Sequence, residues 1–407
     1  MLVRKLGRVV CGMSGGVDSS VAAYLLKKKG YDVVGVFMRN WDSRDAGERC
    51  VLDAEESDAQ FVCDHLKIPM KTVDFVKTYW HSVFSTMLDE YQMGWTPNPD
   101  MLCNRAVKFG VFHEYATRRL GADLVATGHY ARLHPLPDGR VRLMQGVDAV
   151  KDQSFFLAQV KQEALQRSLF PLGDLEKATV KQIAENIGLH KIATKKESMG
   201  LCFIGKRDFR AFVEQYLEPR PGSFVDMETG KVVGTHTGVH SWTVGQRCNI
   251  GGCPVAYYVA RLCHRTQRIS VVPGQHHPAL YWRTLYTDKP HWICRKPPLQ
   301  VTGDAAPTLR CLFRTQHRNS LAWCVAVLNG DTKAATGAAE WPHIGGLKVT
   351  LDDHHRAIAI GQFIVLYGED GECYGSAKIL GLGPSHYDEQ KQAVEPCPPH
   401  RASAAES

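Results

Sequence analysis

Short apolar segments alternate with single helices over the N-terminal half of the chain, and few folds accommodate that order. Consecutive strands that are separated by a helix run parallel, and a parallel sheet has both faces covered. The pattern therefore predicts an α/β N-terminal domain with a Rossmann-like parallel sheet. The strands that we expect lie at 8–11, 32–38, 70–75 and 123–127, with helices at 17–29, 53–66, 79–92 and from 104 onward.

The pattern changes in the second half of the chain. One further helix is expected at 208–217, and a Gly-punctuated, β-rich stretch follows it. Short alternating runs at 323–328, 346–351 and 363–367 then indicate a small antiparallel barrel. We therefore expect an α/β domain at 1–205, a small central α+β domain at 206–300, a C-terminal β-barrel at 301–383 and a polar, disordered tail at 384–407.

Composition excludes several classes of protein. An apolar fraction of 44% argues against wholesale disorder, and no apolar run reaches the roughly 18 residues of a membrane span, so we expect no membrane partner. The net charge of +7 suits a polyanionic partner but does not select one. The 13 cysteines are scattered and never spaced C-x-x-C, which disfavours a secreted disulfide framework and a zinc ribbon.

A glycine-rich loop joins the first expected strand to the first expected helix. Gly15 and Gly16 let the backbone turn tightly, while Ser14 and Ser19 add hydroxyl donors beside a helix N-terminus. Together they form a cradle for pyrophosphate. The alternative is an ordinary Gly-rich turn with a Ser/Asp helix cap. The loop is neither a Walker A motif nor the dinucleotide G-x-G-x-x-G.

The segment Ser-Gly-Gly-Val-Asp-Ser at 14–19 resembles the PP-loop of ATP pyrophosphatases, which cleave ATP between the α and β phosphates and adenylate a carbonyl oxygen. The resemblance implies that ATP, with Mg²⁺, is a cofactor, and that adenine lies over the edge of the sheet. Met38 and Gly128 follow strands at that edge, although ordinary core or turn roles are the alternative. The residues assigned to ATP are Gly12, Met13, Ser14, Gly15, Gly16, Val17, Asp18, Ser19, Met38 and Gly128.

Two cysteines lie in loops where a thiol could react with a substrate. Cys103 ends a loop that runs into a helix, so we expect the helix dipole to lower the pKa of its thiol from about 8.5. Asp100 lies three residues earlier and can accept a proton from a substrate, although a simple Asx turn is the alternative. Cys202 lies between Gly200 and Gly205, which would let a reactive group swing; its alternative is a buried structural thiol.

The order of these motifs resembles one family, the tRNA-specific 2-thiouridylases, which replace O2 of the wobble uridine with sulfur. The resemblance runs from the first strand to about residue 382, and the segments at 37–42 and 195–200 are most similar to the mitochondrial branch. The motifs that carry it are SGGVDS, NPDMLCN, ATGHYAR, KDQSFF, GLCFIG and GQRCNIGG.

The family resemblance implies a mechanism. ATP adenylates O2 of the uridine, and Cys202 receives sulfur as a persulfide from an upstream donor, either a sulfur-relay protein or a cysteine desulfurase system. Cys103 then attacks the persulfide and leaves a Cys103–Cys202 disulfide. Asp100 deprotonates the base or the attacking sulfur. The resemblance implies no tightly bound metal.

The resemblance also names a partner and a location. The partner is tRNA, in particular the tRNAs for Lys, Glu and Gln, and the location is mitochondrial, with the cytoplasm as the alternative. The N-terminus is basic and acid-poor like a transit peptide, but the first strand begins near Arg8. Thr315 stands where the family usually has an aromatic residue, which removes a stacking face. The residues assigned to tRNA and the target base are Asn98, Pro99, Asp100, Lys151, Asp152, Gln153, Arg314 and Thr315.

Three alternatives remain open. A PP-loop amide or amidine ligase needs no paired cysteines, and the sequence has no glutaminase module. A non-catalytic tRNA-binding protein would not need the intact loop together with Cys103 and Cys202. An iron–sulfur-dependent variant would need another thiol near that pair, and the candidate, Cys11, is more typical of a core residue.

Overall fold

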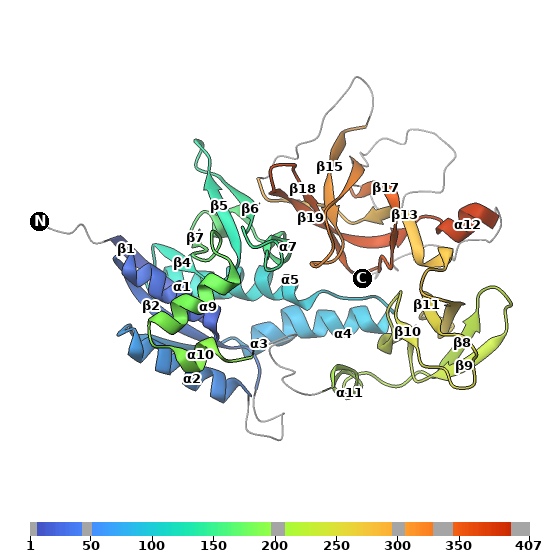
Figure 1. Ribbon diagram of the computed structural model, residues 1–407, viewed down its shortest axis with the longest axis horizontal. Helices are drawn as coiled ribbons and strands as arrows, with labels where there is room; N and C mark the ends of the chain where they lie inside the picture. Colours follow the sequence, from blue (N-terminus) through green and yellow to red (C-terminus); the bar gives the residue numbers. More distant parts are fainter. Residues whose placement is uncertain (1–5, 43–50, 197–207, 295–305, 329–344, 392–407) are drawn as a thin grey trace, which may run out of the picture.

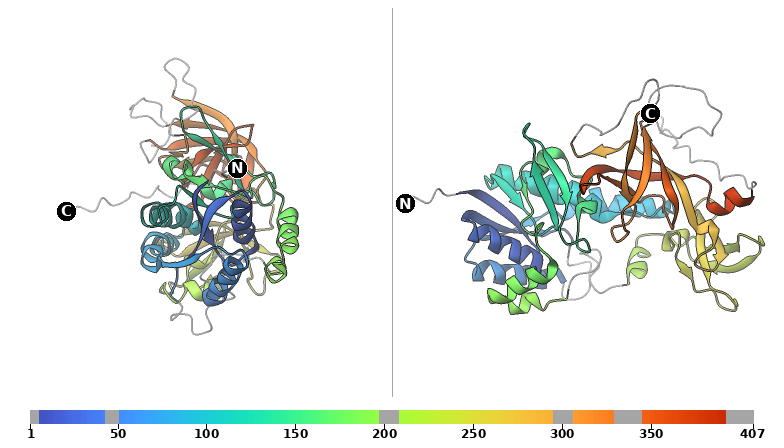
Figure 2. Two further views of the ribbon diagram at one scale, coloured as in Figure 1. Left: turned by 90° about the vertical axis from the view of Figure 1, so that its left-hand side faces the viewer. Right: turned by 45° about the horizontal axis from the view of Figure 1, so that its top comes forward.

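The computed structural model describes residues 6–42, 51–196, 208–294, 306–328 and 345–391 (Figure 1). An α/β domain forms one end of the elongated molecule, and the barrel and a smaller sheet form the other (Figure 2). None of the described helices is long and apolar enough to cross a membrane.

The N-terminal domain has the predicted parallel sheet, in the strand order β3-β2-β1-β4-β7. Val9 and Cys11 of β1 pack under helices α1, α2 and α9, whereas Val10 packs under α6 on the opposite face. Both faces are therefore covered, as the alternation predicts. The strands are β1 (Leu6–Met13), β2 (Tyr31–Arg39), β3 (Met70–Asp74), β4 (Leu124–Ala126) and β7 (Ser168–Leu169); the helices are α1 (Val17–Lys28), α2 (Val51–His65), α6 (Phe112–Arg119), α8 (Gln162–Leu165), α9 (Lys177–Asn186) and α10 (His190–Ala193).

A helical segment leads from the α/β domain toward the far end of the molecule (Figure 1). It consists of α3 (Val76–Tyr79), a π-helical turn η2 (Trp80–Phe84) and α4 (Ser85–Gln92). The chain returns through α5 (Pro99–Cys103) and a second π-helical segment, η3 (Asn104–Val111). Helix α5 therefore begins at Pro99 and not near residue 104. Asn98 caps it, because its Oδ1 accepts a hydrogen bond from the Met101 N–H at 3.2 Å, and proline suits the first helical position.

The central domain is a five-stranded sheet with the order β10-β11-β12-β8-β9. The helix before it, α11 (Phe209–Val213), is capped by Asp208. It packs against the helical segment, with the rings of Phe212 and Phe84 5.9 Å apart. The strands are β8 (Gly222–Asp226), β9 (Val232–His236), β10 (Arg247–Cys248), β11 (Tyr257–Cys263) and β12 (Arg268–Pro273), with short 3-10 helices η4 (Val239–Ser241) and η5 (Pro278–Leu280).

The C-terminal strands form a closed antiparallel barrel, as predicted. Neighbouring strands pair in the order β13-β17-β16-β15-β18-β19, and β13 pairs with β19 to close the ring. The barrel takes in residues from 281 onward, earlier than the expected boundary at 301. Its strands are β13 (Tyr281–Thr287), β15 (Thr308–Arg314), β16 (Ala322–Leu328), β17 (Leu347–Arg356), β18 (Phe363–Tyr367) and β19 (Glu372–Leu382).

The start of the predicted disordered tail is folded. Helix α12 (His386–Lys391) follows the barrel, and its Tyr387 is 7% exposed because it packs against Leu280 and Ala279. The prediction of disorder is wrong for this helix, since one buried aromatic ring anchors a segment whose composition is otherwise polar. Residues 392–407 lie outside the described part of the chain.

A hairpin of the α/β domain joins the sheet of the barrel, which the sequence did not predict. Its strands are β5 (Ala131–Pro135) and β6 (Val141–Gln145), and β6 pairs with β19; β14 (His291–Trp292) also pairs with β19. Next to the hairpin, before α7 (Ser154–Leu157), the Asp152 carboxylate is fully buried. It accepts hydrogen bonds from Gly146 N–H at 3.0 Å and Ser154 Oγ at 2.9 Å, and it pairs with Arg314 of the barrel at 3.2 Å.

Replacing Asp152 by alanine should destabilise this junction. The change leaves the Arg314 guanidinium buried without its counter-ion, and breaking a buried pair in this way costs about 3–5 kcal/mol. Thermal unfolding followed by circular dichroism measures the loss. Asp138→Ala removes an exposed pair with Arg140 and serves as the matched control that should leave the transition unchanged. Equal transitions for both variants would show that the buried pair does not hold the junction.

Candidate functional site

The glycine-rich loop lies at the carboxyl edge of the sheet, between β1 and α1. The strand order reverses there, because β2 and β4 flank β1 on opposite sides, and such switch points bind ligands in open α/β sheets. Gly15 has a φ of +67°, and a Cβ on it would come within 2.3 Å of the Glu55 carbonyl oxygen. Only glycine therefore fits this turn. The hydroxyl of Ser19 accepts a hydrogen bond from the Ser14 N–H at 3.1 Å and stabilises the loop from within.

The other predicted nucleotide residues meet at the same edge. Gly128 follows β4, and a Cβ on it would lie 2.8 Å from the Ser19 amide nitrogen, so the backbone approaches the start of α1 closely. Met38 lies near the end of β2, half-buried beside Gly12. Met13 and Val17 are buried, so these two contribute backbone and core packing rather than exposed side chains.

A buried lysine pairs with the acidic residue of the loop. Lys177 Nζ lies 2.7 and 2.8 Å from the two carboxylate oxygens of Asp18, and the Tyr130 hydroxyl donates to the same carboxylate at 2.7 Å. Lys177 and Tyr130 are both buried, whereas about a third of the Asp18 side chain is exposed, at 36%. The pair fixes the carboxylate and brings a positive charge close to the phosphate cradle. Lys177 was not predicted, because it starts α9 and belongs to no sequence motif.

Cys103 differs from its prediction. It is the last residue of α5 rather than a residue beside the helix N-terminus, and it is 7% exposed. Burial raises the pKa of its thiol, the positive charge of Lys108 opposes that shift, and the negative charge of Asp100 adds to it. The predicted lowering of the pKa is therefore wrong, because α5 starts one turn earlier. Cys103 is a neutral thiol in this arrangement and needs a base before it can act as a nucleophile.

Asp100 lies in the first turn of α5 and is reached by solvent. The surrounding protein raises the pKa of its carboxyl by desolvation, and the charges of Lys108 and His317 oppose the rise. His317 comes from the barrel; its Nε2 contacts the Asp152 carbonyl oxygen at 2.5 Å, and its ring lies 4.8 Å from that of Phe156. The barrel thus supplies a side chain to the surroundings of Asp100. Neither Lys108 nor His317 belongs to a motif that would have predicted this proximity.

The residues assigned to tRNA divide into two groups. Asn98 is buried, and its Nδ2 donates to Gln362 Oε1 of the barrel at 3.2 Å. Asp152, Arg314 and Thr315 are buried as well, so all four side chains support the site from inside. Pro99, Lys151 and Gln153 are half-buried, and Asp100 is exposed. Contact of any of these residues with RNA stays a prediction.

The second predicted reactive cysteine, Cys202, lies outside the described residues, together with its GLCFIG motif. Among the described cysteines, Cys11 and Cys63 are core residues, and burial raises the pKa of each thiol to about 12. Cys11 therefore fits the core role that the sequence favours.

Comparison with known proteins covers nearly the whole chain. Three family models match: the tRNA methyl transferase HUP domain at residues 7–206, the tRNA methyl transferase PRC-barrel domain at 210–273, and the Aminomethyltransferase beta-barrel domain at 282–379. The "Mitochondrial tRNA-specific 2-thiouridylase 1" of Homo sapiens is 46% identical over 411 residues, which cover 96% of this chain and 94% of that protein. The protein of the same name in Drosophila melanogaster is 45% identical, covering 92% and 94%. The "tRNA-specific 2-thiouridylase MnmA" of Chromohalobacter salexigens is 43% identical, covering 91% and 92%.

Replacing Lys177 by methionine should weaken ATP binding by roughly tenfold or more, because a charge-assisted hydrogen bond is worth about 1.5–3 kcal/mol and the Asp18 charge would then repel the phosphates. Isothermal titration with Mg-ATP measures the dissociation constant. Lys161→Met, an exposed lysine before α8, is the matched control. If the two variants bind ATP equally well, the Lys177–Asp18 pair does not serve the cradle.

The alkylation of Cys103 should be slow at neutral pH and should accelerate only as the pH rises above the usual range of a thiol, because its pKa is raised. Lys108→Met should slow the reaction further, whereas Asp100→Asn should speed it. Iodoacetamide labelling at several pH values, with quantification of the Cys103 peptide by mass spectrometry, tests this. Rapid labelling at pH 7 in the unchanged protein contradicts the raised pKa.

Proposed function

The chain belongs to the tRNA-specific 2-thiouridylase family, and from this we propose that it is an ATP-dependent sulfurtransferase that replaces O2 of the wobble uridine in mitochondrial tRNAs with sulfur. The observation that carries the proposal is identity above 40% to the named 2-thiouridylases along nearly their full length. The mitochondrial location and the tRNAs for Lys, Glu and Gln follow from the family branch and form part of the proposal.

The first half of the proposed reaction activates the base. Gly15 allows the tight turn of the loop and Gly128 allows close packing against the start of α1, whose N-terminus points a partial positive charge at the phosphates. Adenylation of uridine O2 converts a poor leaving group into AMP and releases pyrophosphate. We assign Asp18 and Lys177 to holding the triphosphate and its Mg²⁺ in position.

The second half transfers sulfur. Cys202 carries a persulfide from a sulfur-relay protein or a cysteine desulfurase system, and its outer sulfur attacks C2 while AMP leaves. Cys103 then attacks the inner sulfur; the S–S bond breaks, the thiocarbonyl stays on the base, and a Cys103–Cys202 disulfide forms. An external reductant restores both thiols. The sulfur atom that the tRNA gains is thus the outer sulfur of the persulfide.

Asp100 is the proposed base for this step. A carboxyl with a raised pKa takes up a proton more readily near neutral pH, and Asp100 is close enough to Cys103 for its charge to raise the pKa of the thiol. Proton transfer from Cys103 to Asp100 would produce the thiolate at the moment of attack. Lys108 then offsets the negative charge of the pair.

Replacing each of the two cysteines by serine should block the reaction at a different step. Cys202→Ser should take up no sulfur, because a hydroxyl cannot carry a persulfide. Cys103→Ser should load sulfur on Cys202 but stall before multiple turnovers, since the resolving thiol is missing. Radiolabelled sulfur on the isolated protein, followed by quantification of 2-thiouridine in the tRNA, separates the two stages.

Cys63→Ser and Cys324→Ser are the controls, since both thiols are fully buried in core elements; they should cost stability but leave sulfur transfer intact. Label on Cys202→Ser protein, or full multiple-turnover thiolation by Cys103→Ser, refutes the assigned roles. If the variants contradict these roles but the unchanged protein still thiolates tRNA, only the assignment of the two cysteines is refuted, and the proposed function remains.

A further inference from the structure

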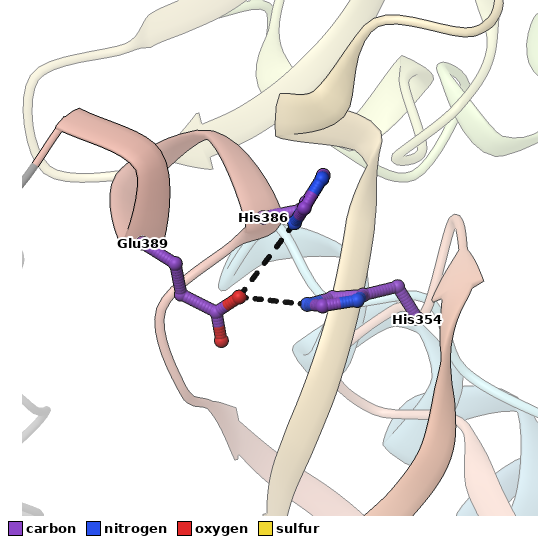
Figure 3. A group of neighbouring side chains, drawn as sticks. All are labelled: His354, His386 and Glu389. Atoms are coloured by element: carbon purple, nitrogen blue, oxygen red, sulfur yellow. Dashed lines mark hydrogen bonds and ion pairs between the residues drawn. The ribbon is translucent and has the colours of Figure 1, made fainter.

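Two histidines and a glutamate meet outside the proposed active site, where the C-terminal helix packs beside the barrel (Figure 3). His354 lies near the end of β17, and His386 and Glu389 lie on α12. Glu389 Oε2 is 2.8 Å from His354 Nε2 and 3.7 Å from His386 Nδ1. The two imidazole ring centroids are 4.4 Å apart. Nothing in the proposed reaction uses these side chains.

The local structure builds the cluster without help from an ion. His386 and Glu389 are three residues apart on α12, so both side chains lie on one face of the helix. Ser385 and Asp388 fix the start of that helix: Ser385 Oγ donates to Asp388 Oδ2 at 2.7 Å, and Asp388 pairs with Arg261 of the central domain. The ligand atoms of the cluster are therefore held within 4.8 Å of one another by the fold itself.

We propose that His354, His386 and Glu389 bind a divalent transition-metal ion of the zinc class. Two imidazole nitrogens and one carboxylate oxygen form a ligand set that zinc uses in proteins, with a water in the fourth position. Tetrahedral zinc with ligands at about 2.0–2.2 Å separates its ligand atoms by roughly 3.4 Å. The distances of 2.8 and 3.7 Å lie on either side of that value, so small side-chain shifts suffice.

His386 provides the strongest sign that an ion belongs here. Its Nδ1 is buried and has no hydrogen-bond partner among the described residues, although it faces Glu389. Its other ring nitrogen, Nε2, lies 2.9 Å from the side-chain amide of Gln390, which orients the ring. A metal on Nδ1 leaves the proton on Nε2, and a half-turn of the Gln390 amide places its Oε1 to accept the hydrogen bond that metal-binding histidines commonly donate from the second nitrogen. The bound ion would link α12 to β17 and fasten the C-terminal helix to the barrel.

Zinc binding to the untagged full chain tests the proposal. The protein is stripped with a chelator and titrated with Zn²⁺ against a chromophoric competitor. His386→Gln and Glu389→Gln should each weaken the zinc site by about 100-fold or more, because loss of a mere outer-shell partner costs about 10–100-fold. His134→Gln, an exposed histidine on β5, is the matched control. Circular dichroism of the metal-free variants checks that α12 and the barrel remain folded.

Cobalt substitution distinguishes this cluster from zinc bound by the cysteines. Co²⁺ at the proposed site should give a visible absorption without the sulfur charge-transfer bands of a thiolate site, and that absorption should disappear in His386→Gln. Equal zinc stoichiometry and affinity in wild type, both cluster variants and the control would overturn the proposal. The three side chains would then form only an ion-paired cluster between the helix and the strand.

Discussion

The buried pair between Asp152 and Arg314 is the contact on which the arrangement of this site depends. One partner follows the hairpin of the α/β domain, the other ends a barrel strand, and both are nearly inaccessible to water. An unpaired charge at this depth would be costly, so the pair holds the two domains in one relative position. Because of it, His317 of the barrel reaches the neighbourhood of Asp100, and Gln362 donates to the Thr96 and Pro97 carbonyls that precede α5.

The site separates two kinds of chemistry that the proposed reaction requires. The phosphate cradle at the sheet edge relies on close backbone packing at Gly15 and Gly128, with Lys177 compensating the charge of Asp18. The thiol of Cys103 is instead buried and neutral, beside a carboxyl of raised pKa. A neutral thiol resists oxidation until a base and a substrate meet it. This suits an enzyme whose resolving cysteine should react only after sulfur has reached the tRNA.

Local sequence signals predicted the fold well where local chemistry determines it. The alternation of strands and helices predicted the parallel sheet, and the spacing of the glycines predicted the tight turn between β1 and α1. Asn98 followed by Pro99 is a local capping pattern that marks the start of α5. With the helix starting there, Cys103 lies at its end, and the predicted lowering of its pKa does not hold. The pairing of β6 with β19 and the contact of Lys177 with Asp18, 159 residues away, leave no local signal. Such contacts depend on tertiary packing rather than on spacing.

The most direct test of the proposed function is product analysis of a reconstituted reaction. Purified protein, ATP, a persulfide donor and an unmodified mitochondrial tRNA for lysine are incubated, and nucleosides and nucleotides are quantified by mass spectrometry. The account predicts 2-thiouridine at the wobble position, with one AMP and one pyrophosphate formed for each sulfur transferred. Thiolation that proceeds without ATP, or ATP cleavage to ADP and phosphate, would contradict it.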